Sequence, residues 1–342
     1  MKRLTLIGAG LIGQERLKAV ETLRERGHSV RVTTAFDPYQ PRLGDLAKLH
    51  GFTPRATLGE ALDQPADLVV IACPHDVAVD CACQAIEKGH TVLMEKPIGR
   101  SPAETDRIVH AARTGQPFFV GFNYRFMPGI ARLWRDWHDG QFGQPISLRL
   151  QMGHGGRPGD EKTWKLDPVR CGGGALLDPG IHLLDLCRLF LGEPLLVQGV
   201  TAWRGFWKTG IEEDAQALLA GSTANASVDV SVVRWRSSFD LFALGSDGYG
   251  HVTGRGRSYG RQIYRRGPRW GWQAAPNQAA SETVVVDDAC EDSFARELAG
   301  CLKLEEPPVI PPADMLDGVA VMQLYALVRS HLPSSHGNPP VG

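Results

Sequence analysis

The chain has 342 residues, which is enough for about two domains and a large buried core. Its 37 lysines and arginines nearly balance 38 aspartates and glutamates, and the formal net charge is -1. This balance excludes a global field that would favour nucleic acid or a membrane surface, so we expect neither as a partner.

The seven cysteines form no Cys-x-x-Cys pair, so their pattern predicts neither a disulfide framework nor a zinc site. We therefore expect no bound metal and a reduced, cytoplasmic setting. No run of about 18 apolar residues occurs, and we expect no membrane span. The Ser-, Gly- and Pro-containing end, 333–342, is predicted to be disordered.

The first third of the chain alternates short apolar runs with helical patterns. Strands are predicted over 4–7, 29–36, 68–72, 91–94 and 118–120, and helices over 11–26, 43–50, 77–88 and 102–113. Strands that alternate with helices in this way favour a right-handed, doubly wound parallel sheet. We predict an α/β protein whose N-terminal Rossmann domain covers residues 1–122.

After residue 123 the pattern changes to strands that follow one another. Helices are predicted over 129–138, 181–191, 293–304 and 313–331, and strands over 146–151, 196–203, 215–219, 226–235, 239–244 and 283–286. Successive strands with turn signals between them favour antiparallel pairing. We predict a second domain of α+β type over 123–332, with a large, mostly antiparallel open sheet.

A glycine-rich turn, Gly8-Ala9-Gly10-Leu11-Ile12-Gly13, joins the first predicted strand to the first helix. The first glycine permits a tight turn, the second lets the backbone approach a pyrophosphate, and the third permits close packing of helix on strand. The N-terminus of the helix favours the phosphate charge. This turn, with Leu11 and Ile12 inside it, predicts a dinucleotide site.

Two further segments bear on the cofactor. Asp37 follows the second strand, where a carboxylate would accept hydrogen bonds from a ribose 2′-hydroxyl and repel a 2′-phosphate. NAD is therefore the expected cofactor, although the nearby Arg42 keeps NADP open. Cys73-Pro74-His75 ends the 68–72 strand and is placed to line the nicotinamide side, unless His75 caps the following helix.

The tripeptide Glu95-Lys96-Pro97 stands where the 91–94 strand ends. Ligands of open α/β sheets bind at the carboxyl ends of the strands, so Lys96 is placed to reach a reacting group over a bound nicotinamide. The proline fixes its own φ and helps to hold the lysine backbone. Read alone, the same tripeptide is also compatible with a surface turn and a solvated lysine.

A second polar set follows a run of glycines. If the chain after Gly174 is helical, Asp178, His182 and Asp185 are spaced i, i+4 and i+7 and share one face of an apolar helix. Pro179 would then lie in the first turn or kink the helix. Histidine titrates near neutrality and suits the base that takes a hydroxyl proton, and a lysine ammonium stabilises an alkoxide. The alternative is a satisfied core network.

The glycine fingerprint, Glu95-Lys96-Pro97 and the run Gly172-Gly173-Gly174-Ala175-Leu176-Leu177-Asp178-Pro179-Gly180-Ile181-His182-Leu183-Leu184-Asp185 together resemble the Gfo/Idh/MocA family (glucose–fructose oxidoreductase, inositol dehydrogenase, MocA). The resemblance covers nearly the whole chain, including the junction Asn123-Tyr124-Arg125-Phe126. It implies a Rossmann domain and a second domain whose open sheet forms the contact in a homodimer or homotetramer.

The resemblance also assigns roles to individual residues. It implies that Lys96 is the catalytic lysine and that Asp178 and His182 are the other polar catalytic positions. Asp185 would bind a substrate hydroxyl or support its neighbours. The cofactor positions it implies include Glu95, Lys96 and Asn123. Cys171 and Pro179 stand where a serine and an aliphatic residue are expected, so the local geometry is open while the charged groups are intact.

The substrate is expected to be carbohydrate-like. Arg157, Trp164 and Lys165 precede the catalytic glycines and, with Arg125, offer cations around an aromatic ring. Such a set suits a polyhydroxylated sugar or cyclitol, with or without a carboxylate, phosphate or nucleotide diphosphate, and Lys96, Asp178, His182 and Asp185 would complete the contacts. Solvated loop charges are the alternative. A second basic run, 254–272, is expected to be a solvated hairpin or an arm on a partner subunit.

The leading hypothesis is therefore an NAD(P)-dependent oxidoreductase that transfers a hydride between nicotinamide and a secondary hydroxyl or ketone of a sugar, cyclitol or nucleotide-sugar. Two alternatives of other classes stay open. One is a glycoside hydrolase on the same scaffold, whose bound NAD is reduced and reoxidised in each turnover. The other is a non-catalytic, NAD-responsive binding protein.

Overall fold

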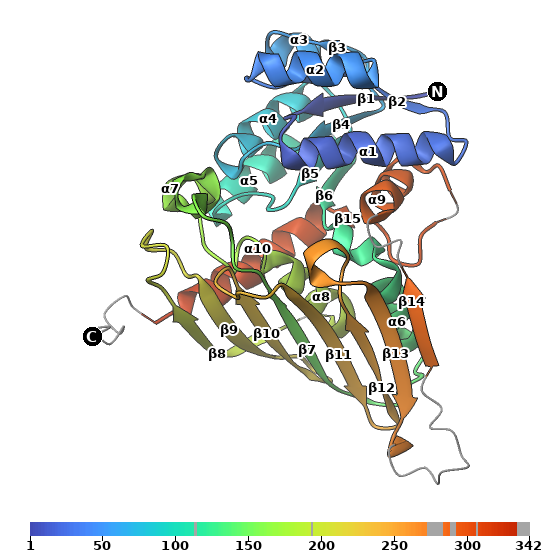
Figure 1. Ribbon diagram of the computed structural model, residues 1–342, viewed down its shortest axis with the longest axis vertical. Coiled ribbons are helices and arrows are strands. Elements are labelled where there is room, and N and C mark those ends of the chain that lie inside the picture. The colour runs from blue at the N-terminus through green and yellow to red at the C-terminus, as the bar shows by residue number, and fades with distance from the viewer. Residues whose placement is uncertain (113–114, 193, 272–282, 288–291, 306, 334–342) are drawn as a thin grey trace. The chain divides into compact units, whose positions relative to one another are not determined.

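A computed structural model describes residues 1–112, 115–192, 194–271, 283–287, 292–305 and 307–333. The chain divides into two compact units (Figure 1). The first contains Met1–Asn123 and Asp292–Met322, and the second contains Tyr124–Glu291 and Gln323–Gly342. Most of the tail predicted to be disordered, 334–342, lies outside the described residues.

The first unit is built on a seven-stranded sheet with the order β15-β6-β5-β4-β1-β2-β3. Its strands are β1 (Lys2–Ile7), β2 (Val30–Phe36), β3 (Thr53–Pro54), β4 (Leu68–Ile71), β5 (Val92–Glu95), β6 (Phe118–Gly121) and β15 (Ala313–Asp314). All pairs are parallel except β15 with β6. The predicted doubly wound parallel sheet is confirmed, and β1, β4 and β5 are its buried centre because apolar residues fill both of their faces.

Helices connect these strands as the alternation predicts. They are α1 (Leu11–Glu25), α2 (Gln40–His50), α3 (Leu58–Leu62), α4 (His75–Glu87) and α5 (Pro102–Ala111). The predicted N-cap of α5 is present, because the Ser101 hydroxyl accepts the N–H of Glu104 at 3.3 Å and Pro102 occupies the first turn. Helix α1 begins at Leu11, within the glycine turn, which brings its N-terminus to the carboxyl end of β1.

The segment 292–322 belongs to the first unit, which corrects the sequence-based grouping of this segment with the second domain. Helix α9 (Ser293–Leu302) contributes Ala295, Leu298 and Leu302 to the same core cluster as Leu4, Leu6 and Leu17. Strand β15 extends the first sheet beside β6. An amphipathic helix reveals its apolar face in the sequence but not the surface that this face will cover.

The second unit contains an eight-stranded sheet with the order β14-β13-β12-β11-β7-β10-β9-β8. The strands are β7 (Pro145–Gly153), β8 (Leu196–Trp203), β9 (Asp214–Ala220), β10 (Asn225–Ser231), β11 (Ser238–Gly245), β12 (Gly248–Thr253), β13 (Gln262–Pro268) and β14 (Thr283–Asp287). Among the residues that the structure describes, only β7 and β10 pair in parallel, so the prediction of a mostly antiparallel sheet is confirmed. The basic run 254–272 was expected to be a hairpin or arm, and its residues 262–268 form the inner strand β13.

Helices α6 (Pro128–His138) and α8 (Ile181–Leu191) cover one face of this sheet (Figure 1). Helix α10 (Met315–Ser330) is the last element of the described residues, and the division between the units falls within it. The other face of the sheet carries no helix of the described residues. Within the described part of the chain, no helix has the length and apolar character needed to cross a membrane.

Candidate active site

The glycine turn has the geometry that a dinucleotide needs. Gly8 has φ +93°, and a Cβ on it would lie 2.6 Å from the carbonyl oxygen of Ala72. A Cβ on Gly13 would lie 2.1 Å from the Gly8 carbonyl oxygen. Gly10, the N-cap of α1, instead faces open space within 4 Å of its Cβ position. The turn is therefore tight on two sides and open on the third, which fits a pyrophosphate against the N-terminus of α1.

Asp37 lies beside this turn and is fully engaged. One of its oxygens accepts the N–H of Ala9 at 2.7 Å, and the other accepts the N–H of Tyr39 at 2.8 Å. The Arg42 guanidinium donates to both oxygens, at 2.9 and 3.0 Å. The expected ribose-binding carboxylate is thus at the expected place, and an arginine already occupies it.

The segment after β4 is packed tightly. The Cys73 thiol donates to the Ile7 carbonyl oxygen at 3.5 Å. Its hydrogen bond to Cys81 and its burial raise its pKa well above the usual value, so it stays a neutral thiol. Pro74 is the N-cap of α4, and the buried His75 is the first residue of that helix. His75 therefore does not cap α4 with its side chain.

Glu95 is the last residue of β5 and Lys96 follows it at the predicted strand end, and the Lys96–Pro97 peptide bond is cis. The Arg16 guanidinium of α1 lies 2.6 Å from Glu95 and 2.6 Å from Glu297 of α9. Both Arg16 and Glu297 are buried. Burial alone would lower the pKa of Arg16, but the two carboxylates more than offset it and raise that pKa. Glu95 is consequently an ion-pair partner that holds the turn before the half-buried Lys96.

Asn123 is also held from α9. Its side-chain amide donates to the Ser293 hydroxyl at 3.0 Å, and both residues are buried. Position 123 was assigned to the cofactor by the resemblance, and in the structure its amide group ties the end of the first stretch of this unit to α9. The first unit thus brings together the glycine turn, Asp37, Glu95, Lys96 and Asn123 on the strand ends and their supports.

In the second unit, α8 begins at Ile181, so Asp178 precedes the helix and does not share its face. This corrects the predicted i, i+4, i+7 arrangement, of which only His182 and Asp185 remain within α8. The Asp178–Pro179 peptide bond is cis, and Pro179 lies outside the helix. A proline in the helix interior would remove a backbone donor and clash with the preceding turn, which explains the late start.

His182 is buried and stacks on Tyr124, with ring centroids 3.9 Å apart and planes at 2°. The Tyr124 hydroxyl donates to the sulfur of Met152 on β7 at 3.3 Å. Burial raises the pKa of Tyr124, which therefore stays protonated. Tyr124 thus fixes the plane of the His182 imidazole, a role that the sequence analysis missed although Tyr124 follows the junction residue Asn123.

Arg125 and Asp185 form a buried ion pair, in which the Arg125 Nε donates to Asp185 at 2.8 Å. Two oppositely charged groups that are buried this close together neutralise each other's charge, and removal of either would leave an uncompensated buried charge. The pair links the 123–126 turn to α8. Both positions were expected to contact substrate, and the structure joins them in a buried pair that involves α8, the helix that also carries His182.

Asp178 is the centre of a second set of contacts. The Lys165 ammonium lies 3.1 Å from its carboxylate, which raises the pKa of Lys165, and it stands 5.7 Å from the ring of Trp164. His154, which follows β7, lies within the field of Asp178, but burial lowers the pKa of His154 and keeps it neutral. Arg157 is exposed, so the structure joins Lys165, Trp164 and Asp178 and leaves Arg157 at the rim.

Arg255 reaches this region from the connection between β12 and β13. Its guanidinium carbon lies 4.0 Å from the ring centroid of Tyr259 and 5.2 Å from that of Tyr124. Gly254 and Gly256 flank it with φ of +73° and +82°, which only glycine adopts readily. The Gly-x-Gly spacing was the signal that could have separated Arg255 from the other arginines of the basic run, since it marks a tight turn that presents one side chain. Trp272, at the end of that run, lies outside the described residues.

The glycine run before Asp178 is held by a buried carboxylate. The Glu212 carboxylate accepts the N–H of Gly174 at 2.9 Å and of Leu176 at 3.3 Å. A Cβ on Gly174 would lie 2.0 Å from the Glu212 carbonyl oxygen, so no other residue fits. Burial raises the pKa of Glu212 against the opposing effect of these N–H groups.

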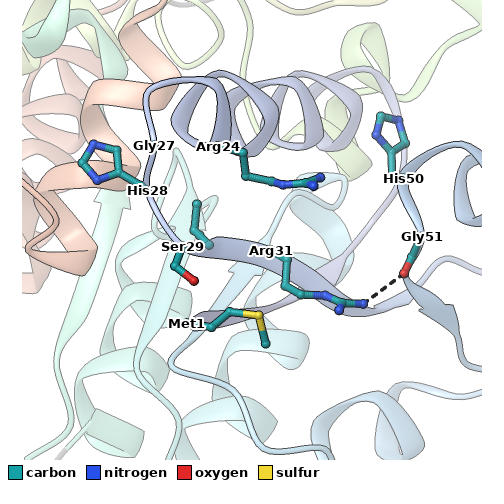
Figure 2. A pocket seen from close by; sticks show the side chains of 9 residues that line it. Met1, Arg24, Gly27, His28, Ser29, Arg31, His50 and Gly51 are labelled. Atoms are coloured by element: carbon teal, nitrogen blue, oxygen red, sulfur yellow. Dashed lines mark hydrogen bonds between the residues drawn. The ribbon is translucent and has the colours of Figure 1, made fainter.

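A depression of about 510 Å³ lies at the opposite, N-terminal edge of β1 and β2 (Figure 2). Its lining includes Arg24, His28, Arg31 and His50, and Arg31 donates to the Gly51 carbonyl oxygen at 3.3 Å. None of the candidate residues lines it, and parallel sheets bind ligands at the other end of their strands. This depression is not the candidate site.

The fold and the glycine turn define a class of proteins that combine a dinucleotide-type Rossmann domain with an open-sheet domain. Residues 2–122 match the family model described as an oxidoreductase family with an NAD-binding Rossmann fold, and residues 131–250 match the Gfo/Idh/MocA C-terminal domain. The chain belongs to the Gfo/Idh/MocA family, as the sequence resemblance indicated.

Curated relatives act on several kinds of sugar. The levoglucosan dehydrogenase of Pseudarthrobacter phenanthrenivorans is 28% identical over 141 residues, covering 40% of this chain and 36% of its own length. The glucose-6-phosphate 3-dehydrogenase of Bacillus subtilis is 26% identical over 224 residues, covering 64% and 62%. The chain thus matches less than two thirds of the length of these relatives.

A solved structure extends the likeness to the whole fold. The 3-ketoreductase KijD10 from Actinomadura kijaniata, crystallised with NADP and TDP-benzene, has a TM-score of 0.79 at 19% identity, covering 97% of this chain and 98% of its own. At this identity the likeness shows the shared fold alone.

Proposed function

We propose that the protein is an NAD(P)-dependent oxidoreductase that moves a hydride between nicotinamide and a secondary hydroxyl or ketone of a carbohydrate. The observation that carries this proposal is the His182 ring of the second unit, which is buried and stacked at 3.9 Å on Tyr124. The first unit adds the glycine turn that is open for a dinucleotide. A histidine whose ring is fixed in plane is suited to exchange a proton with a substrate hydroxyl.

Each candidate residue then has a distinct task. A bound nicotinamide would supply or accept the hydride. Gly10 faces the open space that its pyrophosphate would fill, and Gly8 and Gly13 permit the tight turn that shapes this space. His182 takes the hydroxyl proton as the carbon–hydrogen bond breaks, and the Lys96 ammonium stabilises the negative charge that develops on the oxygen. In the reverse direction His182 returns the proton to the alkoxide.

Asp178 serves the substrate side of the same reaction. Its carboxylate, paired with Lys165 at 3.1 Å, is suited to accept a hydrogen bond from a second substrate hydroxyl. The polyhydroxylated substrate class is supported by this pair and by the sugar names of the relatives, which include an anhydro sugar and a sugar phosphate. Arg157 and Trp164 remain proposed substrate contacts at the rim of the site.

We also propose that copies of the chain associate through the helix-free face of the second sheet. Phe242 and Tyr249 stack on this face with ring centroids 5.5 Å apart, and Leu218 is 56% exposed there. The same face carries Arg149 opposite Phe242 and the His251–Asp240 pair, so the proposed contact between copies would join apolar and polar side chains. None of the described cysteines forms a disulfide, which agrees with the proposed reduced, cytoplasmic setting.

The test is a sugar panel offered with NAD and NADP while NADH or NADPH absorbance is followed. Replacement of Lys96 by Met is expected to lower kcat by about 100-fold or more with a smaller change in KM, because its charge acts on the developing alkoxide. Lys48→Met, an exposed helix position, is the matched control and should leave kcat unchanged.

Three results would contradict the proposal. The first is full activity of Lys96→Met. The second is tight sugar binding without any change in cofactor absorbance. The third is glycosidic bond cleavage without net NADH, which would instead identify the hydrolase that shares this scaffold.

A further inference from the structure

Three aromatic rings gather in the second unit outside the residues assigned above. Phe206 and Trp207 lie between β8 and β9, and Trp235 lies between β10 and β11. The Phe206 ring centroid is 4.9 Å from that of Trp207 and 4.8 Å from that of Trp235. Trp235 is 69% exposed and Phe206 is 48% exposed. Groups of large, solvent-exposed apolar rings are uncommon unless they bind a ligand or a partner.

The rings stand on a rigid base. Glu213 is fully buried, and its carboxylate accepts the N–H groups of Gly205, Phe206 and Trp207 at 3.2, 2.8 and 2.8 Å. The Trp207 indole N–H donates to the Val232 carbonyl oxygen at 3.3 Å, which ties the two connections together. A surface loop without a task does not need a buried charge to hold it, because solvent would satisfy the same N–H groups.

The rings also adjoin the candidate substrate segment. A Cβ on Gly155 would lie 3.0 Å from the Trp235 ring, and one on Gly156 would lie 2.6 Å from the Trp207 ring. These glycines follow His154, whose carbonyl oxygen accepts the N–H of Arg234 at 3.1 Å. His154 in turn lies in the field of Asp178. The segment from His154 to Gly156 therefore connects Asp178, the carboxylate proposed to bind the substrate, with the aromatic rings.

We propose that Phe206, Trp207 and Trp235 form a subsite for a second ring of the substrate, attached to the sugar that is oxidised or reduced. The ligand chemistry is a flat or apolar ring face, either a second sugar or a nucleobase, because both stack on indole and phenyl rings. Arg157, exposed next to Gly156, is placed for an anionic link between the two rings. The inference rests on the proposed function and narrows its substrate class to two-ring molecules.

The test measures binding of matched probes by saturation-transfer NMR and by titration, so it does not depend on turnover. The probes are methyl glucoside, phenyl glucoside, cellobiose, ribose 5-phosphate and UMP. Wild-type protein should bind the probes that carry a second ring about tenfold more tightly than their one-ring partners. Trp235→Ala should abolish this preference, and Trp235→Phe should retain most of it. Trp203→Ala, a tryptophan that is 41% exposed on β8, is the control and should have no effect.

The outcomes separate this inference from the proposed function. A preference for UMP alone identifies a nucleotide as the second ring, and a preference for cellobiose or phenyl glucoside identifies a glycosyl or aglycone ring. Equal binding of one-ring and two-ring probes, with sugar oxidation intact, would overturn the subsite alone. If Trp235→Ala changed the molecular mass of the assembly in solution but not the preference for two-ring probes, the rings would be assigned to a contact between copies, and the subsite would be overturned. Ring preference without redox activity on any sugar would overturn the proposed function and leave the subsite standing.

Discussion

The two units hold their functional segments with buried glutamates, but the partners of those glutamates differ. In the first unit Glu297 faces the Arg16 guanidinium, which it shares with Glu95 beside Lys96. In the second unit Glu212 and Glu213 face backbone N–H groups of the glycine run and of the aromatic connection. The Arg16 guanidinium joins side chains of α1, β5 and α9. Each carboxylate of the second unit instead accepts N–H groups from a single loop and fixes the conformation of that loop.

This difference predicts different sensitivities. The first arrangement depends on balanced charge, because a buried ion without its partner is costly. The second depends on acceptor oxygens, so a neutral amide of the same shape can replace the carboxylate. Variants that remove a charge and keep the shape of the side chain therefore test whether the two units differ in this way.

The largest effect is expected at Arg16. Arg16→Met should lower the free energy of unfolding by about 3–5 kcal/mol, because two carboxylates would be left in the core without a cation. Urea unfolding followed by fluorescence measures this loss, with Arg24→Met, an exposed arginine of the same helix, as the control. Unchanged stability in Arg16→Met would mean that the carboxylates do not need the guanidinium, and the comparison between the units would fail.

A smaller, pH-dependent effect is expected at Glu212, whose pKa burial raises. A raised native pKa means that the folded state binds the proton more tightly than the unfolded state, so this contribution to stability is complete below the ordinary glutamate pKa of 4.5 and is lost as pH rises through the native pKa. Glu212→Gln lacks that dependence while it retains an acceptor for the N–H of Gly174. The stability of Glu212→Gln relative to wild type should therefore rise with pH, as unfolding at pH 5 and pH 8 would measure, each pH roughly within the range where native proteins are usually most stable. A constant difference across this range would contradict the assignment.

The sequence predicts the parts of the fold that local patterns encode. Alternation of strands and helices identified the first sheet, and the glycine fingerprint predicted a turn in which Gly8 and Gly13 have no room for a side chain. The same reasoning could not place α9, because an apolar helix face does not name its partner. It also grouped Asp178 with α8, since a pattern of spacing does not show where a helix begins when a proline intervenes.

The candidate site of the second unit was harder to predict because distant loops build it. Tyr124, His154 and Arg255 approach Asp178 and His182 through sheet register, which depends on pairings far apart in the chain. The pairing of Arg125 with Asp185 across 60 residues is equally invisible to local spacing. Lys96, by contrast, stands at a strand end that its own neighbours predict, which is why it could be singled out first.

The smallest predicted effect concerns the Asp37–Arg42 pair of the first unit and the choice between the two cofactors. A carboxylate offers about four acceptor positions, and the N–H groups of Ala9 and Tyr39 with two bonds from Arg42 use them. Arg42 must therefore turn away before a ribose diol can bind Asp37, and once turned it can meet a 2′-phosphate. Arg42→Gln should shift the ratio of affinities toward NADH over NADPH by about fivefold, close to 1 kcal/mol, because the Arg42 side chain is 38% exposed although Asp37 is buried. Fluorescence titration with both cofactors measures the ratio, and Arg31→Gln, exposed on β2, is the control. An equal change for the two cofactors would show that Arg42 does not select between them.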